Sequence, residues 1–278
     1  MDIKDTLAEL QALMAAGDMQ KVCVRCTEIL ATGLADAPSI LVLENYVRAL
    51  HVLGRLNEAE AACTREVILL ENMFGADHPH VSSALHNLSR IIGEQGRHEE
   101  AIPVSERELA IVRASNPGSG READALVTLA EHHYENSRFE KADELLKEAL
   151  AIYEKVEGGR FMGVSTCLNN LGRSAENQGK ESEALLYLAE AADIRLQVLG
   201  NHPDTAFTLL NYGTALASVG EFTEASRVLM KGAEIYSQLG MDSSPYAKAC
   251  RDNLQVCQQN IQPIVCSCAA GGAGGCCG

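Results

Sequence analysis

Between residues 40 and 75 the apolar side chains fall every three or four positions, a spacing that places them on one face of an α-helix. The first apolar face comprises Leu43, Tyr46, Val47, Leu50 and Leu53. Gly54 follows and can adopt the positive φ that ends a helix. A second face comprises Ala59, Ala62, Val67 and Leu70. The pattern predicts two helices joined by a tight turn, and the small side chain of Ala59 lets them pack closely.

This two-helix pattern occurs five times along the chain. Its first apolar residue recurs at intervals of 42, 41, 42 and 41, as Leu43, Leu85, Leu126, Leu168 and Leu209. A second motif keeps the same register and ends in Ala59, Ala101, Ala142, Ala184 and Ala225. Neither helix of a pair can bury its apolar face alone, so neighbouring pairs must stack. The sequence therefore predicts an all-α repeat protein.

A period of 41 to 42 residues also suits HEAT and armadillo arrays, so the period does not distinguish the families. The motif does: Leu-x-x-Leu/Tyr-Gly/Ala is followed by Gly and then by Ala, and this resembles tetratricopeptide repeats. The links Asp77-His-Pro79 and Asn201-His-Pro203 resemble those of kinesin light chains and related bacterial repeats. The resemblance implies a right-handed superhelical solenoid of about six helix-turn-helix repeats with a C-terminal cap helix. The heptad coiled coil of kinesin light chains is missing from this sequence, so a motor-subunit role does not carry over.

The repeat register divides the chain into segments. We expect a solenoid over residues 1–262, with a degenerate first repeat at 1–40, five repeats at 41–245 and the cap helix at 246–262. Residues 263–278 are rich in Cys and Gly and are expected to form a flexible tail.

In tetratricopeptide arrays one face of each first helix lines a concave groove that holds peptides or partner helices. The corresponding residues here are Asn45, Asn87, Asn170, Asn211 and Asn253, and, three positions later in three repeats, Arg48, Arg90 and Arg173. An amide can both donate to and accept from a peptide backbone, and Arg can grip a carboxylate through two parallel bonds. The resemblance thus implies a partner protein or peptide with acidic or C-terminal carboxylate groups. Alternatively, the Asn belongs to the repeat consensus and bonds within the fold.

The formal net charge of -15 disfavours nucleic acids and anionic membranes as partners, because both are themselves negatively charged. Hydrophobic residues make up 46% of the chain, which is enough to bury a core. No run approaches the roughly 18 apolar residues of a membrane span, and the first residues do not read as a secretory signal. We therefore expect a cytoplasmic protein with reduced cysteines.

Catalytic chemistry is not indicated. No phosphate loop, nucleophile elbow or His-Glu-x-x-His motif is present, so we expect neither an enzyme nor a cofactor. Cys23 and Cys26 have the spacing of a metal or redox pair but lie in a predicted helix, where packing is the better interpretation. The weak metal candidates are the tail thiols of Cys266, Cys268, Cys276 and Cys277. The main hypothesis is a peptide-binding scaffold. The alternative is a thiol- or metal-handling protein that presents this tail.

Overall fold

The computed structural model describes residues 3–157 and 162–261, which fold into thirteen helices and no strands. The first seven are α1 (Ile3–Ala15), α2 (Met19–Ala31), α3 (Asp36–Val52), α4 (Leu56–Phe74), α5 (Pro79–Glu94), α6 (His98–Ser115) and α7 (Gly120–Glu135). The others are α8 (Phe139–Glu157), α9 (Met162–Asn177), α10 (Glu181–Val198), α11 (Pro203–Ser218), α12 (Phe222–Gln238) and α13 (Pro245–Asn260). The all-α prediction is confirmed.

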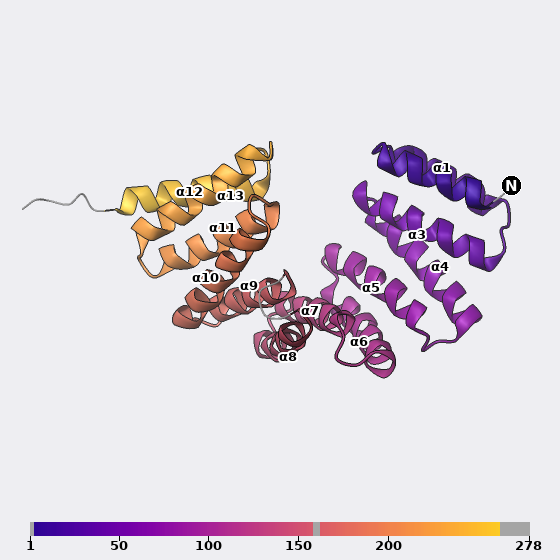
Figure 1. Cartoon of the computed structure of the whole chain (residues 1–278), viewed down its shortest axis with the longest axis horizontal. Helices are drawn as coiled ribbons and strands as arrows, with labels where there is room; N and C mark the ends of the chain where they lie inside the picture. Colours follow the sequence, from indigo (N-terminus) through magenta and orange to yellow (C-terminus); the bar gives the residue numbers. More distant parts are fainter. Residues whose placement is uncertain (1–2, 158–161, 262–278) are drawn as a thin grey trace, which may run out of the picture. The chain divides into compact units, whose positions relative to one another are not determined.

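The chain divides into two compact units, residues 1–180 and residues 181–278. In the first unit, α3 packs on α4, α5 on α6 and α7 on α8, and each hairpin also packs on the next (Figure 1). In the second, α11 packs on α10 and α12, and α13 packs on α12. The five small residues predicted to allow close helix pairing are at most 1% exposed: Ala59, Ala101, Ala142, Ala184 and Ala225.

The turn within each hairpin is built on a left-handed residue. Gly54 has φ 68° and ends α3, as the sequence pattern predicts. The equivalent residue before α8 is Ser137, which takes the same conformation with φ 57° despite its side chain. The hairpin geometry therefore requires this conformation even where the sequence does not supply glycine.

The His-Pro links start two helices. Pro79 and Pro203 occupy the first helical position of α5 and α11, where the missing N–H has no intrahelical partner to lose. The preceding residues, His78 and His202, cap the helices. In each, the ring Nδ1 accepts a hydrogen bond from the backbone N–H two residues later, at 3.2 Å. This capping role of histidine was not expected from the sequence.

The cores follow the apolar pattern with one correction. Leu43, Val47 and Leu50 are buried in the first unit, but Leu53, expected on the same face, is 38% exposed. It is the C-cap residue of α3, so no further turn of this helix follows it. Across the described ranges, no helix combines the length and apolarity needed to span a bilayer.

Candidate functional site

The predicted groove residues lie on the first helix of each hairpin and fall in both units. The first unit carries Asn45 and Arg48 on α3, Asn87 and Arg90 on α5, and Asn170 and Arg173 on α9. The second unit carries Asn211 on α11 and Asn253 on α13. The first unit holds every predicted arginine.

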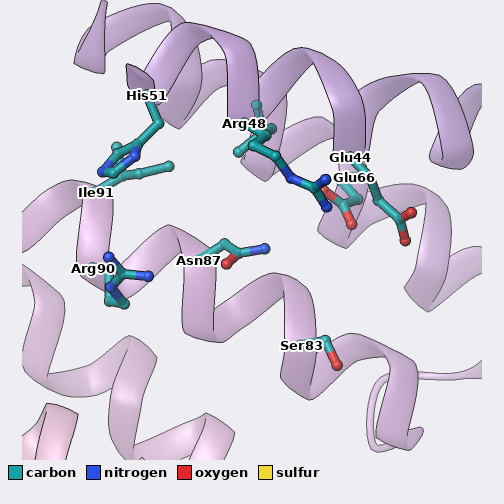
Figure 2. Close-up of a pocket in the computed structure, with 9 residues that line it drawn as sticks. Glu44, Arg48, His51, Glu66, Ser83, Asn87, Arg90 and Ile91 are labelled. Atoms are coloured by element: carbon teal, nitrogen blue, oxygen red, sulfur yellow. The ribbon is translucent and has the colours of Figure 1, made fainter. Parts of the chain in front are cut away.

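Three of these side chains share one cavity. Arg48 from α3 and Asn87 and Arg90 from α5 line an opening of about 450 Å³ between the two helices. Figure 2 shows the three side chains directed toward the space between α3 and α5. The remaining lining residues are Glu44, Val47, His51, Ser83, Ile91 and, from the second helix of the hairpin, Glu66. The volume lies within the range of about 300–1,000 Å³ typical of ligand pockets.

The two arginines of this cavity have free donor capacity. Arg48 is exposed and forms no ion pair or hydrogen bond with any residue of the described ranges. The Arg90 Nη2 is 3.6 Å from Glu94 Oε1, which is longer than a hydrogen bond, and about half of the Arg90 side chain is exposed. Exposed ion pairs of this kind contribute little to stability. Both guanidinium groups are therefore available to an incoming anion.

The asparagines differ from one another in what they bind. Asn45 donates to the carbonyl oxygen of Leu41 on its own helix, at 2.7 Å, and does not line the cavity. Asn253 donates to the Thr214 hydroxyl at 2.9 Å and so joins α13 to α11. Asn87 makes no side-chain hydrogen bond to any described residue, and it lines a neighbouring cavity as well. Of Asn45 and Asn87, it is Asn87 that lines the cavity.

Arg173 lies in a different environment. Its guanidinium stacks over the ring of Tyr134, 4.6 Å from the ring centroid, and its Nη2 is 3.7 Å from Glu135 Oε1. With Asn170 it lines an opening of only about 10 Å³, which is too small for a peptide side chain. The structure therefore does not bring Arg173 and Asn170 together with Arg48 and Arg90 in one cavity.

Glu66 of α4 is a residue of this site that the sequence analysis missed. Its side chain is 3% exposed, and its Oε2 is buried without a hydrogen-bond partner in the described part of the chain. Burial, and secondarily the negative charge of Glu44, raise the pKa of Glu66 to about 7. One signal could have revealed it: Glu66 follows Ala59 by seven positions, where later repeats carry Ala149, Ala191 and Gly232.

The second repeat has the same substitution with a different outcome. Glu108 follows Ala101 by seven positions and is equally buried. Its Oε1 is 3.0 Å from His86 Nδ1, so it has a partner within the fold. Its Oε2, like that of Glu66, is buried without a partner, but Glu66 makes no hydrogen bond to a described residue at either oxygen.

Helix α7 carries two buried histidines, His132 and His133. His132 of α7 is 3% exposed, and its Nδ1 is 3.3 Å from His98 Nδ1. Burial, followed by the charges of His98 and His133, lowers the pKa of His132 to about 4. The neutral imidazole of His132 fills space above Gly93, where a Cβ would come within 2.6 Å of its ring.

The cysteines of the described ranges are packed rather than reactive. Cys23 and Cys26 are both buried, and burial raises the pKa of the Cys26 thiol to about 12. No cluster of three or more His, Cys, Asp or Glu side chains there is arranged to hold a metal ion. The predicted tail over residues 263–278, including Cys266, Cys268, Cys276 and Cys277, lies outside the described residues, as does the link Gly158-Gly-Arg160.

Known proteins share the repeat. The family model "Tetratricopeptide repeat" matches residues 38–114 and 121–197. A curated relative, the human "Tetratricopeptide repeat protein 19, mitochondrial", is 27% identical over 88 residues, which are 32% of this chain and 23% of that protein. The match thus spans less than a quarter of the relative's length.

Two of the solved structures that share this fold are a putative kinesin light chain and a quorum sensor. One is a putative kinesin light chain from Podosopora anserina with nearly identical TPR-like repeats; it is 21% identical, covers 71% of this chain and 94% of that one, and has a TM-score of 0.59. The other is NprR, a quorum sensor of B. thuringiensis, in complex with its cognate peptide NprX. It is 13% identical, covers 92% of this chain and 71% of that one, and has a TM-score of 0.62.

Proposed function

Because the chain belongs to the tetratricopeptide repeat family, we propose that it is an interaction scaffold that holds an extended segment of a partner protein against the first unit. The observation that carries the proposal is the shared cavity of Arg48, Asn87 and Arg90 between α3 and α5. Three of the eight predicted groove side chains line this one opening. Arg48 and Asn87 make no ion pair or hydrogen bond with a described residue, and Arg90 has only a long contact with Glu94. The scaffold needs no chemistry of its own for this role.

The groove chemistry favours a peptide with acidic groups. Arg48 and Arg90 can each hold a side-chain or C-terminal carboxylate through paired hydrogen bonds. The amide of Asn87 can both donate to and accept from one peptide unit, which fixes an extended backbone without regard to its sequence. The complex of NprR with its peptide supports the proposal by showing that a protein of this fold can hold a peptide.

A defined peptide library tests this function. Random twelve-residue peptides displayed on phage are selected against the full-length chain, and the enriched peptides are synthesised for affinity measurement. We expect enrichment of Asp and Glu, and about tenfold or greater weakening by the double substitution Arg48→Ala and Arg90→Ala. Binding should also weaken as salt rises, because exposed charges are screened.

The matched control is Arg65→Ala, which removes an exposed arginine of α4 that does not line the cavity. It should bind the selected peptides as the parent does. If no peptide is enriched, or if the double variant and the control bind equally well, the proposed groove is wrong.

A further inference from the structure

The buried carboxylate of Glu66 has no hydrogen-bond partner among the described residues. A buried polar atom without a hydrogen bond is costly, and native structures contain few of them. Glu66 Oε2 is such an atom, and its side chain forms part of the wall of the 450 Å³ cavity (Figure 2). Because the side chain lines the cavity and makes no hydrogen bond to a described residue, a ligand in the cavity can pair with its carboxylate.

The fold itself does not require a glutamate at this place. The equivalent residues Ala149, Ala191 and Gly232 serve the same helix packing with a methyl group or less. Glu108 has a carboxylate there but also has His86 to bind it. Packing therefore explains the small residues and the His86 pair explains Glu108, while Glu66 has no structural role that the neighbouring side chains reveal.

The charges around Glu66 point to one class of ligand. Glu44 of α3 lines the same cavity and adds a second carboxylate. Arg48 forms no ion pair in the described ranges, and His51 is engaged with Glu94, its Nε2 lying 2.7 Å from the Glu94 Oε2. Neither carboxylate forms an ion pair with a described residue, so both can pair with a positive group of a ligand, and a desolvated carboxylate binds such a group more strongly than an exposed one.

We propose that Glu66, assisted by Glu44, binds a cationic group of the partner segment, namely a lysine or arginine side chain or a free N-terminal amine. This inference rests on the proposed function and adds to it the requirement for one cation beside the carboxylate held by Arg48 and Arg90. The partner segment is thus dipolar: its positive group enters the cavity toward α4, and its negative group stays at the exposed guanidinium groups.

The phage selection described above is repeated on Glu66→Gln, which keeps the size of the side chain and removes its charge. Against the parent chain we expect peptides that carry Lys, Arg or a required free amino terminus in addition to Asp or Glu. Against Glu66→Gln the basic residue should no longer be enriched, and peptides selected on the parent should bind about tenfold or more weakly. Acetylation of the peptide amino terminus and Lys→Gln changes in the peptide distinguish the two sources of the cation.

Glu58→Gln is the matched control, because Glu58 is an exposed residue of the same helix outside the cavity. Circular dichroism confirms that each variant is folded. If acidic peptides are enriched but carry no cation, or bind Glu66→Gln as tightly as the parent, this inference is overturned while the proposed function stands. If neither the arginine variants nor Glu66→Gln affects any selected peptide, or none is selected, both are overturned.

Discussion

Replacing Glu66 by glutamine tests whether its carboxylate is unpaired in the free protein. The pKa of this group is raised from 4.5 to about 7, mainly by burial and further by the charge of Glu44. Between these two values the native state holds the proton more tightly than the unfolded chain does. The free energy of unfolding therefore falls as pH rises from 4.5 through about 7, and it loses nothing more from this group at higher pH.

The size of the effect follows from the two pKa values. The interval from 4.5 to about 7 corresponds to about 3 kcal/mol, at about 1.4 kcal/mol per pKa unit. A glutamine side chain does not ionise, so it carries no cost of holding a buried negative charge. We expect Glu66→Gln to be about as stable as the parent near pH 4.5 and about 2–3 kcal/mol more stable at pH 8. For a unit of this size that gain raises Tm by about 4–12 °C.

Thermal melting followed by circular dichroism, at several pH values from 4.5 to 8, measures this difference on the full-length chain. Glu58→Gln serves as the control because it removes one negative charge from the same helix at an exposed position. The reasoning fails if the difference in Tm between Glu66→Gln and the parent is the same at every pH in this range. It also fails if Glu66→Gln is the less stable protein at pH 8, because the carboxylate would then have a partner within the fold.

Four further substitutions have expected outcomes in the same melting assay. Arg48→Ala should leave Tm within about 1 °C, because this side chain pairs with no described residue; a larger loss would show that it neutralises a carboxylate. Arg195→Ala should cost about 2–4 kcal/mol, since it removes the hydrogen bonds that join α10 to α11 and takes away a partner of the buried Thr208 hydroxyl. The parent should lose up to about 3 kcal/mol of stability as pH falls from 6.5 toward 4, because burial disfavours protonation of the His132 ring, and His132→Asn should not show this loss. Ala142→Leu should cost about 1–3 kcal/mol, because the site is 0% exposed.

The sequence was sufficient to predict the helices and their pairing. Periodic apolar residues define which face of each helix is buried, and the turn position requires a left-handed conformation that Gly54 supplies directly. Leu53 shows the limit of this reasoning. Its spacing continues the apolar stripe, but Leu53 is the C-cap residue of α3 and is 38% exposed, so periodicity alone does not show where the buried face of a helix stops.

The candidate site was only partly predictable, because a repeat position gives the direction of a side chain but not its partners. Arg48, Asn87 and Arg90 were selected by register, and they meet in one cavity. Asn45 was selected by the same rule, yet its amide bonds to the preceding turn of its own helix. Whether such a side chain faces the cavity or bonds to its own helix depends on short-range hydrogen bonds, and the repeat pattern does not predict these.

Glu66 shows how departures within a repeat can locate a functional site. A position that stacks one hairpin on the next is under the same packing demand in each repeat, and Ala149, Ala191 and Gly232 meet that demand with small side chains. A glutamate there adds a desolvation cost that stacking does not repay. Glu108 offsets part of the cost by pairing one carboxylate oxygen with His86, whereas Glu66 has no such partner among the described residues. Local rules are broken most often where function requires it, so the uncompensated position is where a ligand contact is expected.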